Sequence, residues 1–294
     1  MRIPLKVIML ALIAIFLGLG ISPGGAFANL KPVASRPAKR SAGAAKSGNV
    51  SFAEFKKSAT QNIAPVPNFN NLCSKPSSQT SRACVIAAIE AINNAHMESH
   101  IPPVKVNIAN LEKLNGPETL LAAVNLERIA RHKKPFVGLT KFFDQVARKA
   151  AESKTDPALS SGELILGRNG YVSDWGGNWA ENVTSPLAAN YDFVYQDGPG
   201  EFNLLCTVGN TSGCYGHREN ILGEYPYTLG ACGSLKPELL MGASVLNHHP
   251  RYNNPPSITE LFVGICVKHP IRPYITWADI ERKLLVGNSL LVTN

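Results

Sequence analysis

Six cysteines, at positions 73, 84, 206, 214, 232 and 266, constrain this chain more than any other feature of its sequence. An even number of cysteines in an exported chain is typical of a disulfide framework, although sequence alone allows fifteen pairings of six cysteines. The first four form two pairs that are close in sequence, and short loops are the easiest to close. We therefore predict the disulfides Cys73–Cys84, Cys206–Cys214 and Cys232–Cys266.

The amino terminus has the organisation of a secretory signal peptide. Arg2 and Lys6 give it a basic start, residues 7–21 carry no charge, and residues 26–28 (Ala-Phe-Ala) supply a small-x-small cleavage site. The apolar run is shorter than the ~20 residues of a membrane helix, so an uncleaved anchor is the weaker alternative. We expect cleavage after Ala28 and a secreted, extracellular mature protein.

Residues 29–50 form a basic segment rich in Lys, Arg, Pro, Ala, Ser and Gly, without an aromatic residue. Such a composition buries too little apolar surface to offset the entropy of ordering, so we predict a flexible linker. Two cations lie in the signal peptide and five in this linker, so the formal charge of +8 falls to +1 for residues 51–294. A nearly neutral folded part argues against a nucleic-acid partner, while the linker suits weak, salt-sensitive contact with anionic surfaces.

Three helices are predicted in the first half of the folded part. Apolar residues recur at three- to four-residue spacing over 83–99 and 141–152, which is typical of amphipathic helices. Another helix should begin at residues 115–117 (Asn-Gly-Pro), because proline is favoured at the first helical position. Residues 154–180 are rich in turn-forming residues, and we predict a long structured loop there.

Two strands are predicted near the carboxyl end, at residues 239–246 and 259–267. In the second strand the alternation places one apolar set on one face (Leu261, Val263, Ile265, Val267) and the remaining residues on the other (Phe262, Gly264, Cys266). The segment between the strands should be a hairpin loop that exposes His248 and His249. Adjacent strand-end side chains point in opposite directions, so these two histidines are not expected to chelate one metal.

Residues 214–222 (Cys-Tyr-Gly-His-Arg-Glu-Asn-Ile-Leu) concentrate polar chemistry in one short stretch. Gly216 allows a close backbone approach, and His217 titrates near neutral pH when it is unperturbed. A histidine near a helix start is more often a cap or a packed residue than a catalyst. A structural role for His217 therefore stands beside a functional one.

The residues from Gly216 to Leu222 resemble a segment of the CAP superfamily (cysteine-rich secretory proteins, antigen 5 and pathogenesis-related 1 proteins), in particular its bacterial branch. Further stretches are similar to other parts of that family: Asn125-Leu126-Glu127-Arg128 with Lys134-Pro135-Phe136, Ala180-Glu181-Asn182-Val183, Met241-Gly242-Ala243 and Leu261-Phe262-Val263-Gly264. The likeness covers about residues 115–267. Together with the signal peptide (1–28) and the linker (29–50), this likeness leaves an amino-terminal helical extension (51–114) and a CAP-like domain (115–294).

The resemblance implies an α+β fold, a three-layer α/β/α sandwich around a short, largely antiparallel sheet. It also implies a cleft that contains Glu181 and His217. Many relatives add a second histidine that binds a divalent metal with His217, but residues 155–162 of this chain contain no histidine. Zinc normally takes three or four protein ligands, so no cofactor is expected, and His217, Glu181 and Asp197 are the weak metal candidates.

A secreted binding or interaction module is the function that these features favour. The expected cleft is lined by Glu181, His217, Trp175 and Trp179, and its partner is a small extracellular ligand (lipid, sterol, glycan or peptide) or a cell-wall component. The alternative is a hydrolase, perhaps a peptidase, that uses the Glu/His pair with or without a metal. None of the nearby candidates Ser160, Ser161 and Ser173 lies in a Gly-x-Ser-x-Gly elbow, so the sequence names no nucleophile.

Overall fold

The structure is a computed structural model of the chain, and it describes residues 62–73, 81–201, 203–224, 232–247 and 256–284. All of them belong to one compact unit, Gly48–Asn294. The predicted signal peptide, the basic linker and the hairpin loop with His248 and His249 lie outside the described residues. Within the described ranges, no helix is both long and apolar enough to cross a membrane.

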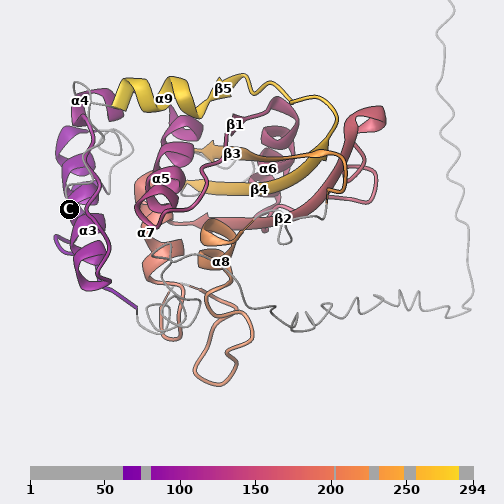
Figure 1. The fold of residues 1–294 in the computed structure, drawn as a ribbon. Helices are drawn as coiled ribbons and strands as arrows, with labels where there is room; N and C mark the ends of the chain where they lie inside the picture. Colours follow the sequence, from indigo (N-terminus) through magenta and orange to yellow (C-terminus); the bar gives the residue numbers. More distant parts are fainter. Residues whose placement is uncertain (1–61, 74–80, 202, 225–231, 248–255, 285–294) are drawn as a thin grey trace, which may run out of the picture. The chain divides into compact units, whose positions relative to one another are not determined.

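A five-stranded sheet in the order β2-β4-β3-β1-β5 organises the described part of the chain (Figure 1). Its strands are β1 (Gly138–Leu139), β2 (Gly170–Glu181), β3 (Lys236–Leu246), β4 (Ser257–Val267) and β5 (Ile275–Thr276). β1 and β3 pair in parallel, and the other neighbours pair antiparallel. β3 and β4 confirm the two predicted strands.

Strand β2 shows that the prediction of a continuous loop over residues 154–180 was wrong. It pairs with β4 from Gly170 opposite Val267 to Glu181 opposite Ser257. Its glycines, asparagine and tryptophans resemble turn chemistry, but pairing with β4 outweighs that local preference. Gly177 also has a packing role, because a Cβ there would lie 2.3 Å from the carbonyl oxygen of Pro157.

The helices of the described residues are α2 (Asn70–Cys73), α3 (Arg82–Glu98), α4 (Ile108–Leu111), α5 (Gly116–Ala130), α6 (Lys141–Ser153), α7 (Pro186–Tyr195), α8 (Gly216–Leu222) and α9 (Trp277–Leu284). α3, α5 and α6 confirm the three predicted helices. α5 begins with a reciprocal cap, in which the Asn115 side chain accepts from the Glu118 backbone N–H and the Glu118 carboxylate accepts from the Asn115 N–H. Such a cap satisfies two amide groups that a helix start leaves unpaired.

Helices cover both faces of the sheet, which confirms the α+β, three-layer prediction. α6 packs on β3 and β4, and the core beneath it contains the predicted aliphatic set of β4 (Leu261, Val263, Ile265 and Val267). Phe262 points to the opposite core, which contains buried residues of α3, α5, α7 and α8. The extension before residue 115 therefore shares its core with the remainder of the unit.

A buried polar cluster joins α3, α5 and α7 inside that second core. Glu127 accepts hydrogen bonds from Tyr195 Oη and lies 3.0 Å from His96 Nε2, and it pairs with Arg131 one turn later. Burial raises the pKa of Glu127, but the charges of His96 and Arg131 outweigh burial and lower it to about 2. The carboxylate therefore stays ionised and paired, as a buried charge requires.

The three predicted disulfides, Cys73–Cys84, Cys206–Cys214 and Cys232–Cys266, are all present in the structure. Disulfides persist in oxidising compartments, so their presence is consistent with an extracellular protein. Cys206–Cys214 closes the loop that leads directly into α8, and Cys232–Cys266 ties the start of β3 to the end of β4.

Candidate functional site

His217 is the second residue of the short helix α8, and several contacts fix that helix. Tyr215, just before it, adopts a left-handed backbone conformation with φ of 65°, and its N–H donates to the Asp197 carbonyl. At the other end, the buried Arg128 guanidinium donates to the carbonyl oxygens of Ile221 and Gly223. A cation at the carboxyl end of a helix is electrostatically favourable, so Arg128 helps to set the position of His217.

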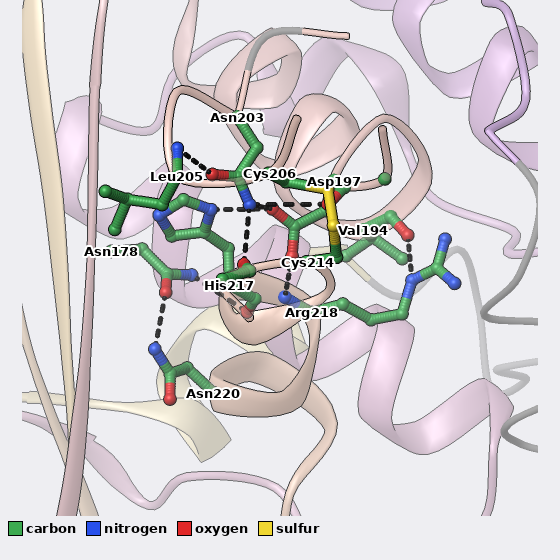
Figure 2. Close-up of polar contacts among 12 residues, drawn as sticks. Asn178, Val194, Asp197, Asn203, Leu205, Cys206, Cys214, His217, Arg218 and Asn220 are labelled. Atoms are coloured by element: carbon green, nitrogen blue, oxygen red, sulfur yellow. Dashed lines mark hydrogen bonds and ion pairs between the residues drawn. A yellow bond between two sulfur atoms is a disulfide. The ribbon is translucent and has the colours of Figure 1, made fainter. Parts of the chain in front are cut away.

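Asp197 is the principal partner of His217 (Figure 2). The imidazole Nδ1 lies 2.7 Å from Asp197 Oδ1, which also accepts from Asn203 Nδ2 at 2.6 Å. The second carboxylate oxygen accepts from the backbone N–H of Arg218 at 3.0 Å. Asp197 is only 1% exposed, and donors on both oxygens compensate for the burial of its charge.

The other ring nitrogen, Nε2, lies 3.7 Å from Asp156 Oδ1 in the loop after α6. That distance is within ion-pair range but long for a hydrogen bond. The side chain of Asp156 is 44% exposed and that of His217 is 17% exposed, so this end of the imidazole faces the solvent side. The Phe193 ring lies 5.1 Å from the imidazole, centroid to centroid.

Both carboxylates favour the charged form of His217. Burial lowers the pKa of His217, but its contacts with Asp156 and Asp197 more than offset burial and raise the pKa from 6.5 to about 9. At pH 7 only about one molecule in a hundred would then carry a neutral imidazole. The site therefore presents an imidazolium whose Nδ1–H is held and whose Nε2–H points outward.

Glu260 of β4 is a buried titratable group near His217 that the sequence reasoning missed. Burial raises its pKa to about 8, although a hydrogen bond from Asn178 and the charge of His217 lower it. Asn178, its direct partner on β2, donates to Glu260 Oε2 at 3.3 Å and to the His217 carbonyl at 3.2 Å. Glu260 Oε1 has no hydrogen-bond partner among the residues that the structure describes. A glutamate inside the apolar run of residues 258–267 was the signal that could have revealed it.

Glu181 has a partner other than His217 in the structure. The Glu181 carboxylate pairs with Lys154 Nζ at 2.8 Å, at the end of α6. The Trp179 indole N–H donates to Ser257 Oγ, which in turn donates to the Ala151 carbonyl of α6. These contacts lie on the α6 side of the sheet.

Trp175 is 37% exposed, and strand alternation puts it on the same face of β2 as Trp179. His217 contacts α7 and the loop before α8, on the opposite face. The contacts thus join His217 to Asp197 and Asp156, and they do not bring Glu181 or the two tryptophans to it.

A divalent metal at His217 would need further protein ligands beside the imidazole. Among the described residues, no group of three or more His, Cys, Asp or Glu side chains is placed to hold one. A metal ligand must be a neutral imidazole, so a metal at His217 would have to displace the proton that Asp197 and Asp156 favour on the ring. The weak metal candidates Glu181 and Asp197 have other partners, namely Lys154 and the His217 Nδ1–H.

A groove of about 440 Å³ lies elsewhere, between the start of α5 and α9. The charged residues along it pair with one another, Lys283 with Glu118 and Arg282 with Asp279. Because these charged side chains already pair with one another, none of them is available to bind a ligand. We therefore place the candidate site at His217.

Comparison with protein-family models, with curated proteins and with solved structures finds no match. The resemblance to the CAP superfamily therefore stays a prediction from the sequence segments that suggest it. The function has to be argued from the geometry around His217.

Proposed function

We propose that this chain is a secreted, CAP-like binding or interaction module whose ligand-binding group is the His217 imidazolium. The observation that supports this most strongly is the pair of carboxylates on the ring, with buried Asp197 on Nδ1 and exposed Asp156 near Nε2. Asp197 fixes the ring and its charge, while Asp156 is loosely paired and can move aside. A ligand acceptor can then take the Nε2–H in a charge-assisted hydrogen bond.

The ligand class follows from that donor. A carboxylate, an amide carbonyl or a sugar hydroxyl can accept from Nε2–H, and such groups are common in peptides, glycans and cell-wall components. The Phe193 ring beside the imidazole adds apolar contact area. The predicted signal peptide and the three disulfides support a ligand outside the cell.

A hydrolase is the second candidate, because a buried carboxylate on Nδ1 is also how a general-base histidine is oriented. Two points weigh against it. A general base must be neutral, and the pKa of about 9 leaves little neutral imidazole at pH 7. The serines nearest in sequence are engaged elsewhere, since Ser160 Oγ donates to Glu163 and Ser173 Oγ donates to the Gly264 carbonyl.

The pH dependence separates the two functions. The mature chain should be screened against lipid, glycan and peptide panels for binding and for turnover, at pH 6, 7.5 and 10. A module that binds through the imidazolium loses affinity as the pH rises through about 9, whereas a histidine general base gains activity over the same range.

His217→Gln tests the side chain directly, with His269→Gln as the matched control because His269 is exposed and distant in sequence. We expect His217→Gln to weaken binding about tenfold, the value of one charge-assisted hydrogen bond, and the control to bind as the wild type does. Turnover that rises with pH and disappears in His217→Gln would establish the hydrolase instead. Binding that is independent of both pH and His217 would refute both functions.

A further inference from the structure

The loop before α8 exposes three aliphatic side chains. Leu204 is 83% exposed, Leu205 is 63% exposed and Val208 is 87% exposed. They lie within five consecutive positions of the loop that joins α7 to α8, which projects from the fold at the bottom of Figure 1. Scattered exposed aliphatics are ordinary, but three on one projecting loop form a local apolar surface.

The loop carries no charge that would oppose transfer to an apolar phase. The sequence contains no Asp, Glu, Lys or Arg between Glu201 and Arg218. Several of its polar groups are satisfied internally: Thr207 and Asn210 exchange backbone hydrogen bonds of 2.9 and 3.0 Å. Backbone groups that are already paired are less costly to move out of water.

The loop is also held in one shape. Cys206–Cys214 closes it, and the Leu205 N–H donates to Asn203 Oδ1 at 2.9 Å (Figure 2). Asn203 in turn donates to Asp197 and to the Gly213 carbonyl. The aliphatic side chains are therefore presented on a scaffold that loses little conformational entropy when it binds.

We propose that this loop inserts its three aliphatic side chains into the interfacial region of an anionic lipid bilayer. A protein partner is the less suitable occupant, because a stable protein interface buries about 800 Å² on each side, far more than three side chains provide. Residues 29–50 add five cations and no acidic residue, which favours an anionic surface. Stable membrane association generally takes two weak signals, and this chain supplies an apolar loop and a basic segment.

This proposal is independent of the ligand assigned to His217. Neither the three aliphatic side chains nor vesicle binding involves the imidazolium, so either proposal can fail alone.

The test is co-sedimentation of the mature chain, residues 29–294, with phosphatidylcholine/phosphatidylglycerol vesicles. The variant replaces Leu204, Leu205 and Val208 together by serine, and Ile165→Ser is the matched control because Ile165 is 67% exposed on a different loop. Circular dichroism and disulfide mapping check that both variants fold. We expect the triple variant to lose about tenfold or more in partitioning and the control to stay within about twofold of the wild type.

Salt isolates the contribution of the loop. At 0.5 M salt the basic segment is screened, so the remaining partitioning should be weaker and should disappear in the triple variant. Binding that vanishes entirely in salt, or that is equal in the wild type and the triple variant, would overturn the proposal. A wild-type chain that does not sediment with these vesicles would overturn it as well.

Discussion

Replacement of Asp197 by asparagine should destabilise the protein in a pH-dependent way. The carboxylate accepts from His217 Nδ1 and Asn203 on one oxygen and from the Arg218 N–H on the other. An amide can accept on one side only, so one buried donor loses its partner and the charge of His217 loses its counterion. At pH 6 we expect the free energy of unfolding to fall by about 3 kcal/mol.

The pH dependence follows from the pKa of His217. Its rise from 6.5 to about 9 is worth roughly 3 kcal/mol at about 1.4 kcal/mol per pKa unit. Because the folded pKa lies above the unfolded one, this stabilisation is complete below pH 6.5 and is lost as the pH rises through about 9. Because Asp156 supplies part of this shift, the difference between wild type and variant should be smaller at pH 10 than at pH 6 by the share that Asp197 supplies.

Urea unfolding of both proteins at pH 6 and pH 10 provides the assay, since other titrating groups contribute equally to both. Asp156→Asn is the matched control. Asp156 also raises the pKa of His217, but its side chain is 44% exposed and its contact is long, so this change should cost less than Asp197→Asn. A stability difference for Asp197→Asn that is the same at both pH values would refute the ionic pairing of Asp197 and His217.

Three further changes probe other parts of the fold. Replacing Cys206 and Cys214 by serine should cost about 2 to 3 kcal/mol for so short a loop, and free thiols at these positions in the native protein would contradict the assignment. Glu260→Gln should stabilise the protein, with a gain that grows from pH 4.5 to about 8, because over that interval the unfolded wild type ionises this carboxyl while the folded state keeps it protonated. Thermal melts that show no such trend would count against a protonated Glu260. Asn115→Ala removes the cap of α5 and should lower the free energy of unfolding by about 1 kcal/mol. Urea unfolding measures this change, and an unchanged value would show that the cap is dispensable.

Much of the fold could be predicted because local signals and tertiary structure agree. The helices α3, α5 and α6 follow apolar periodicity or a proline at the helix start, and the disulfides follow cysteine spacing. Strand β2 could not be predicted in this way. Its tryptophan- and glycine-rich sequence has no apolar alternation, and it is a strand because β4 pairs along its whole length.

The site was only partly predictable for a related reason. His217 was identified from its segment, and Asp197 was noted only as a weak metal candidate. We expected Glu181 to supply the carboxylate that contacts His217. In the structure Asp197 contacts His217 instead, and Glu181 pairs with Lys154. Which carboxylate reaches the imidazole depends on which face of the sheet each residue occupies, and β2 had been taken for a loop.

The ionisation of His217 is the central claim and can be measured directly. NMR titration of the imidazole carbon-bound protons of the mature chain, with His217→Gln to assign the resonance, gives its pKa in solution. We predict a midpoint near 9, with the imidazolium dominant at neutral pH. A midpoint at or below the unperturbed value of 6.5 would show that the carboxylates do not hold the charge, and it would contradict the proposed binding mode.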